Sequence, residues 1–142
     1  MFAYQLRSSL LLAFVACGLL GCGDGRPTRV PIAGKVSVDG QPLKFGVIVF
    51  QPATGRASSG RLDGEGRYVL STYDRGDGAI AGEYVVTISG NEQLSETSRR
   101  WHAPKKYSNP AESGLTATVE DPRDDLNFEL TWDGGKSFVE KF

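Results

Sequence analysis

Cys22 is the residue of this sequence with the clearest potential for covalent chemistry, because it follows a small residue at the end of an apolar run. The other cysteine, Cys17, lies inside that run. A cysteine can form a disulfide, take part in redox chemistry or carry a covalent modification, and its surroundings decide among these roles. The role of Cys22 therefore depends on the segment that presents it.

The first 21 residues have the pattern of a signal peptide. Met1–Arg7 carries a positive charge at Arg7, and Leu10–Leu20 is almost wholly apolar, interrupted only by small residues. At about 1.5 Å per residue, this run is too short to span a hydrocarbon core of about 30 Å. We therefore predict a signal peptide over residues 1–21 and exclude it from the folded domain.

Leu19-Leu20-Gly21-Cys22 resembles the lipobox of bacterial lipoproteins. The resemblance implies that Cys22 is lipidated, with fatty acids such as palmitate, and becomes the first residue of the mature protein. More than one acyl chain would hold the protein firmly, since a single chain binds a membrane only marginally. We then expect a membrane-anchored protein of the cell envelope that faces the periplasm or the exterior. The alternative is an ordinary secretory signal peptide that contains a cysteine.

The mature chain is expected to form one domain without a disulfide. About 120 residues remain after cleavage, which suits a single domain of ordinary size. A lipidated Cys22 cannot pair, although the compartment would permit a disulfide. Residues 22–29 are interpreted as the lipidated cysteine and a tether, in which the small polar residues Gly23–Thr28 predict mobility. Residues 30–142 are then the folded domain.

Composition limits the partners of this chain. Charged residues make up 23% of it and the formal net charge is −1, so no broad electrostatic field attracts nucleic acid. The 18 glycines are scattered between apolar runs and predict many turns. The expected partners are the membrane, through the lipid anchor, and an envelope protein or polysaccharide.

An alternation of apolar and polar residues with a period of two follows Val30 and predicts β-strands. On this basis we expect strands over residues 32–38, 57–62, 67–71, 84–89, 115–120 and 126–131. Residues 45–50 are apolar on both faces and predict a central strand. Turn signals separate them, among them Asp39-Gly40 and Asp63-Gly64-Glu65-Gly66. About seven short strands with frequent turns predict a single antiparallel β-sandwich of the Ig-like or transthyretin-like kind.

Several of these strand-and-turn segments resemble carboxypeptidase regulatory-like domains. The segments are Gly34–Leu43 with Val47–Phe50 after it, Asp63–Leu70, and Gly82–Ile88. Together with the lipobox pattern, they make the chain similar to small lipoproteins of planctomycete-type bacteria that carry this domain. The resemblance implies a transthyretin-like β-sandwich that serves as a non-catalytic accessory, although a fold alone does not determine activity.

The residue inventory contains no catalytic or metal-binding pattern. His102 is the single histidine, which excludes a zinc site built from several histidines, and no metal-ligand spacing is present. No G-x-S-x-G motif occurs. A hydrolase of the transthyretin-like fold would need several histidines. We therefore predict no enzymatic activity, no metal and no cofactor.

Asp74-Arg75-Gly76-Asp77-Gly78 allows two interpretations. Asp74 and Asp77 could bind Ca²⁺, or the Arg-Gly-Asp tripeptide within the segment could be adhesive. The regular spacing of acidic ligands in an EF-hand loop is missing, however. The simpler interpretation, which we favour, is a polar loop between strands with glycines at its turns.

Residues 91–114 are the candidate binding surface. They show no clear period over 24 residues, which is long for a connection inside a compact domain. Cations and rings are concentrated at Arg99, Arg100, Trp101, His102, Lys105, Lys106 and Tyr107. The rings of Trp101 and Tyr107 could stack on a sugar while the cations contact an anionic polymer or lipid headgroups. The alternative, which we favour, is that both rings fold back over an open end of the sandwich.

Two neighbouring segments bear on this surface. Asp121–Asp125 could pair with the cations, and the residues after Trp132 could add an edge strand or fray. The leading functional hypothesis is a structural or protein-interaction module of the cell envelope. The alternative hypothesis is a module that binds a carbohydrate or cell-wall polymer through residues 99–107.

Overall fold

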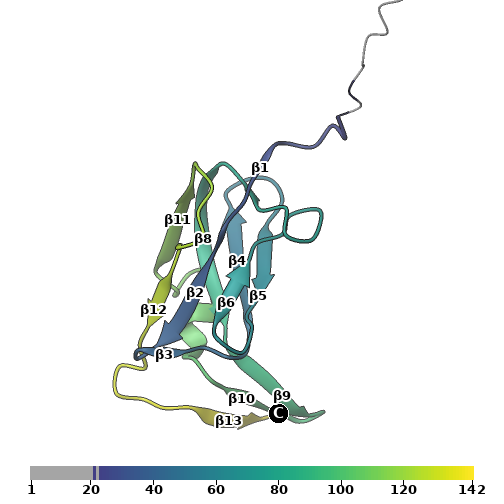
Figure 1. Ribbon diagram of the computed structural model, residues 1–142. Helices are drawn as coiled ribbons and strands as arrows, with labels where there is room; N and C mark the ends of the chain where they lie inside the picture. Colours follow the sequence, from purple (N-terminus) through teal and green to yellow (C-terminus); the bar gives the residue numbers. More distant parts are fainter. Residues whose placement is uncertain (1–20, 22) are drawn as a thin grey trace, which may run out of the picture.

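The computed structural model describes residue 21 and residues 23–142, which form an all-β protein (Figure 1). Most of the predicted signal peptide and Cys22, the predicted site of lipidation, lie outside the described residues. Two sheets face each other and enclose the core, and a smaller sheet extends one end of the molecule. The predicted β-sandwich is thereby confirmed.

The first sheet contains four antiparallel strands in the order β11-β8-β4-β5. Their bounds are β4 Val47–Pro52, β5 Ser58–Arg61, β8 Gly82–Ser89 and β11 Leu115–Val119. In β4, Ile48 and Phe50 are completely buried, whereas Val47 and Val49 are only partly covered. Alternation along the strand therefore turns one side of β4 into the core.

The second sheet is built around β2, and its strands are β2 Ala33–Val38, β3 Gln41–Pro42, β6 Arg67–Val69 and β12 Phe128–Leu130. β3 and β6 pair with β2 in the antiparallel sense. Asp39 and Gly40 join β2 to β3 with φ values of +47° and +79°. This pair of positive φ values is what a tight hairpin turn demands, so the turn predicted from these two residues is confirmed.

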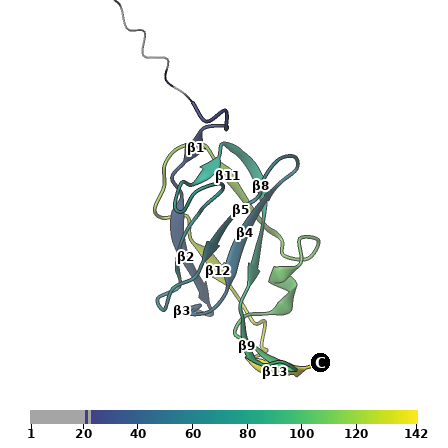
Figure 2. The ribbon, with the colours of Figure 1, turned by 90° about the vertical axis from the view of Figure 1, so that its right-hand side faces the viewer.

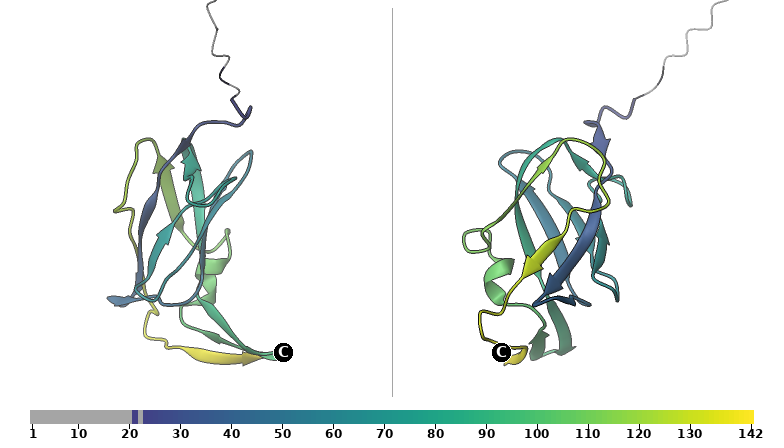
Figure 3. Two further views of the ribbon diagram at one scale, coloured as in Figure 1. Left: turned by 45° about the vertical axis from the view of Figure 1, so that its right-hand side comes forward. Right: turned by 60° about the vertical axis from the view of Figure 1, so that its left-hand side comes forward.

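One strand departs from the wholly antiparallel arrangement that the sequence predicts. β12 runs parallel to β2, with Phe128 opposite Val36. Residues 120–127 carry the chain across from β11 in the first sheet to β12 in the second (Figure 3). Parallel neighbours are not joined by a tight hairpin, and here they lie far apart in the sequence, which local alternation does not reveal.

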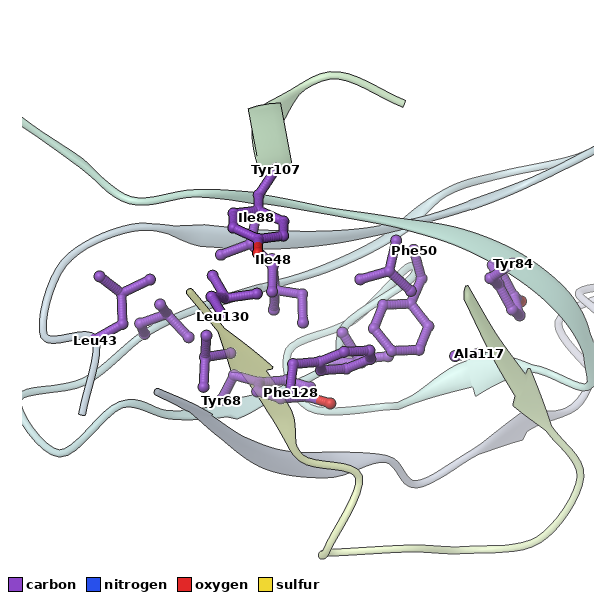
Figure 4. Packing of buried hydrophobic residues seen from close by; sticks show 14 of the residues in the cluster. Leu43, Ile48, Phe50, Tyr68, Tyr84, Ile88, Tyr107, Ala117, Phe128 and Leu130 are labelled. Carbon is purple, nitrogen blue, oxygen red and sulfur yellow. The ribbon is translucent and has the colours of Figure 1, made fainter. Parts of the chain in front are cut away.

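The core between the two sheets is rich in aromatic rings (Figure 4). The centroid of Phe50 lies 5.6 Å from that of Tyr84 and 6.0 Å from that of Phe128. The hydroxyl of Tyr68 donates to the carbonyl oxygen of Leu126 at 2.6 Å. Burial raises the pKa of Tyr68 well above its ordinary value, so the hydroxyl keeps its proton and ties the crossing segment to the core.

The N-terminal segment contacts the sandwich next to residues 23–28, for which the sequence predicts a mobile tether. The first short strand pair is β1 Arg29–Val30 with β7 Ala79–Ile80. Arg26 donates to Asp74 at 3.2 Å, and Arg29 donates to Asp77 at 3.2 Å. Small polar composition suggests freedom, but the Arg29–Asp77 pair is largely covered, with side chains 18% and 13% exposed, and it holds this part of the segment on a loop 48 residues further along. The Arg26–Asp74 pair is exposed to water and adds little.

Asp77 organises the loop before β7. Its carboxylate accepts the backbone N–H groups of Thr72 at 2.7 Å, Tyr73 at 3.2 Å and Asp74 at 3.0 Å. Burial acts to raise the pKa of Asp77, but these donors and Arg29 outweigh it and lower the pKa. The ionised carboxylate therefore stabilises the fold above the ordinary carboxyl pKa, and this contribution is lost as the pH falls through the lowered pKa.

The segment expected to be a long irregular connection contains regular structure. Its elements are β9 Asn91–Ser95, β10 Ser98–Trp101 and the short 3₁₀ helix η1 Lys105–Ser108. A third antiparallel sheet forms in the order β13-β10-β9, with β13 at Phe138–Lys141. The tail after Trp132 thus adds an edge strand. Figure 2 shows this sheet at the end opposite the N-terminal segment.

Candidate functional site

Trp101 lies on β10 of the small sheet and is buried, not displayed at the surface. The residue is 4% exposed. Its indole Nε1 donates to Oε2 of Glu140 at 2.9 Å, and Nζ of Lys105 lies 5.4 Å from the ring centroid. An indole can bind a ligand through its apolar ring or through its N–H group. In Trp101 both are already engaged by other residues of the chain.

Tyr107 on η1 is also buried, at 6% exposure, and belongs to the main core (Figure 4). Its hydroxyl accepts the backbone N–H of Thr131 at 3.2 Å. The fold thus follows the alternative in which the rings of Trp101 and Tyr107 turn back onto the protein. Stacking of a sugar on either ring, which the binding interpretation requires, is not available in this arrangement.

The cations of the predicted surface are paired with carboxylates of the C-terminal segment. Lys106 contacts Asp133 at 2.7 Å, and Lys105 contacts Glu140 at 2.5 Å. The hydrogen bond from Lys105 is the largest of the influences that lower the pKa of Glu140. The acidic turn Asp121–Asp125, proposed from sequence as the partner, pairs internally instead. Within it, Arg123 contacts Asp125 at 2.9 Å.

His102 takes part in a side-chain cluster that links β9 to the β3–β4 loop. Its Nε2 lies 2.9 Å from a carboxylate oxygen of Glu92, and its ring stacks on Phe45 with centroids 4.9 Å apart. Arg99 lies 4.5 Å from the ring centroid of Phe142, and Arg100 is exposed. The seven predicted residues therefore do converge at one end of the molecule, where most of them secure the third sheet.

The Asp74–Gly78 loop has the structural role that the simpler interpretation assigned to it. Asp77 is used by backbone donors and Arg29, and Asp74 contacts Arg26. Across residues 21 and 23–142, no group of three or more His, Cys, Asp or Glu side chains could hold a metal ion. Nor does this part of the chain contain a helix long and apolar enough to cross a membrane.

Exposed apolar side chains gather at the end that carries the third sheet. In the described part of the chain, seven large apolar residues are exposed, and five of them lie at this end. We call these five the distal cluster: Phe45, Leu94, Phe138, Val139 and Phe142. Alternation in so short and polar a sheet gives little signal, so sequence reasoning did not find this cluster.

A second feature that sequence reasoning missed is a groove of about 790 Å³ along β5 and β6. Arg61, Arg67 and Arg75 line it, together with Ser59, Val47 and Val69. Arg61 and Arg67 flank the Asp63–Gly66 turn, whereas Arg75 comes from the loop before β7. Only the fold brings these arginines to one hollow, which we call the arginine groove.

In comparisons with known proteins, no family model, curated protein or solved structure matches this chain.

Proposed function

We propose that this protein is an exported lipoprotein that is anchored at the cell envelope through Cys22 and acts without catalysis as a protein-interaction module. The observation that carries this proposal is the opposite placement of two features. The N-terminal segment contacts one end of the sandwich, and the third sheet, whose strands β9 and β13 carry Leu94, Phe138 and Val139 of the distal cluster, lies at the other (Figure 2).

The docked segment limits how far the domain can stand from its anchor. Four chain steps separate Cys22 from Arg26, which contacts Asp74 of the loop before β7. At about 3.5 Å per residue these steps reach about 14 Å when fully extended. A lipid on Cys22 would thus keep the β1 end beside the membrane and turn the distal cluster outward, toward other envelope components.

Exposed apolar side chains gathered at one end of a domain commonly mark a site of interaction with another protein. Val139 is 44% exposed and lies on β13, an edge strand of the third sheet. The resemblance of Gly34–Leu43 and Asp63–Leu70 to carboxypeptidase regulatory-like domains supports the same proposal, since such domains serve as accessories. The engagement of His102, the single histidine, by Glu92 and Phe45 further favours a role without catalysis.

Lipidation at Cys22 is tested by metabolic labelling with an alkyne fatty acid. We expect the wild-type protein to carry the label and to partition into the membrane fraction. Cys22→Ala should lose all label, because the thiol that accepts the lipid is gone, and Cys17→Ala should be labelled normally because Cys17 leaves with the signal peptide. Equal labelling of wild type and Cys22→Ala would contradict the proposed anchor.

The partner-facing end is tested by crosslinking in the native envelope with a photoreactive amino acid at Val139. The matched control is Val85, which is 39% exposed but lies on β8 in the middle of the first sheet. We expect a discrete protein adduct from position 139 and none from position 85. An adduct from position 85 alone would show that the partner binds the sandwich face instead.

A further inference from the structure

We propose that the arginine groove binds an acidic polysaccharide, a linear sugar polymer that carries carboxylates along its length. This inference concerns a surface separate from the distal cluster and stands whether or not Cys22 is lipidated. The groove runs along the line where the two sheets meet. There Ser59 of β5 and Ser71 exchange both of their backbone hydrogen bonds, at 3.0 and 2.8 Å.

The arginines of the groove are available to a ligand. Among the described residues, neither Arg61 nor Arg75 has a carboxylate within ion-pair distance, and both are exposed. Arg67 contacts Glu65 at 2.9 Å, but these side chains are 56% and 66% exposed, so water already competes for that pair. A guanidinium offers two parallel N–H donors that match a carboxylate, and this geometry favours anions with planar acid groups.

Asp63 also lines the groove, but its carboxylate is hydrogen-bonded to backbone N–H groups and not to an arginine side chain. Oδ1 of Asp63 accepts the backbone N–H groups of Glu65 at 2.8 Å and Arg67 at 2.9 Å. The hydrogen bond from the Arg67 N–H is the largest of the influences that lower the pKa of Asp63. The carboxylate of Asp63 therefore stabilises the turn between β5 and β6. The chain as a whole has a formal net charge of −1, so any attraction of an anion is local to the groove.

The walls of the groove favour a sugar polymer over an acidic peptide. A peptide that binds along a sheet gains affinity by adding a strand to a free edge, but at the centre of the groove this edge is closed by the Ser59–Ser71 pair. Besides the arginines and the exposed turn residues Asp63 and Gly76, the groove is lined by two exposed residues, Ser59, which carries a hydroxyl, and Val69, which is 55% exposed. A hydroxyl and a shallow apolar patch suit the polar and apolar faces of a sugar ring.

The test uses the full-length protein, purified in mild detergent, and measures binding to polygalacturonate by biolayer interferometry. We expect saturable binding that weakens as salt rises, because exposed ion pairs are screened. The double variant R61Q/R75Q should bind about tenfold more weakly or worse, since two charge-assisted contacts are lost. Neutral dextran of the same length should not bind the wild type.

The matched control is K44Q/R100Q, which removes the same charge from two exposed positions outside the groove. It should bind polygalacturonate as the wild type does, and both double variants should melt at the wild-type temperature. Equal losses in the two double variants, or no binding by the wild type, would overturn the proposal. Poly-glutamate that binds as tightly as polygalacturonate and is lost in R61Q/R75Q would assign the groove to an acidic peptide instead.

Discussion

The Gly34→Ala substitution is expected to leave this protein largely unfolded. A Cβ at position 34 of β2 would lie 2.0 Å from the carbonyl oxygen of Leu126 and 2.5 Å from its carbonyl carbon. Both atoms are backbone, so no rotamer change relieves the overlap. The Leu126 segment is fixed by its own hydrogen bonds, from its N–H to Ala33 at 3.1 Å and from Tyr68 to its carbonyl oxygen.

The cost of Gly34→Ala should therefore exceed the roughly 1–3 kcal/mol of ordinary overpacking and approach the whole stability of a small domain, about 5–15 kcal/mol. Circular dichroism and thermal unfolding measure the effect. The control is Gly64→Ala, because a Cβ there meets no atom within 4 Å, and such a surface change is expected to stay within about 0.5 kcal/mol. A Gly34→Ala protein that melts near the wild-type temperature would contradict the close approach of residues 120–127 to β2.

Trp101→Ala is expected to destabilise the third sheet strongly. The indole of Trp101 on β10 is buried, and its N–H donates to Glu140 on β13. Replacing a buried tryptophan by alanine costs about 3–5 kcal/mol, because apolar contact is lost and a cavity remains. We expect a clearly lower melting temperature and faster hydrogen exchange in β9, β10 and β13.

Trp101→Ala also separates the two interpretations of residues 99–107. If Trp101 were a ligand platform, its loss would abolish retention on a glycan column and leave the melting temperature unchanged. Because the ring is buried, we instead expect the melting temperature to fall. Arg100→Ala, at the neighbouring exposed position, is the control and should melt within a few degrees of wild type. An unchanged melting temperature for Trp101→Ala would restore the stacking interpretation.

The strands of the sandwich were predictable because their signal is local. Phe45–Phe50 is a continuous apolar run typical of a central strand, and Asp39-Gly40 marks the turn after β2. β9 and β10 escaped prediction because their residues, Asn91–Ser95 and Ser98–Trp101, are mostly polar on both sides. Their sheet is completed by β13, some 40 residues later in the chain, and no local pattern announces such a partner.

The candidate site shows the same division. The concentration of cations and rings at residues 99–107 was visible in the sequence, and the structure does gather them at one end. Their partners were not visible, since Asp133 and Glu140 were no better candidates by composition than Asp121–Asp125. The arginine groove was likewise hidden, because Arg61 and Arg75 are 14 positions apart and meet only where the two sheets join.

By itself, the sequence determined that the chain is an all-β sandwich, that it has a single histidine for any acid–base chemistry, and that Cys22 ends an apolar run. The tertiary structure decided which rings are buried, which cations are paired and where apolar side chains remain exposed. The physical reason is the distance along the sequence over which each effect acts. Alternation and turn chemistry act between near neighbours, whereas burial and ion pairing depend on how distant strands are brought into register.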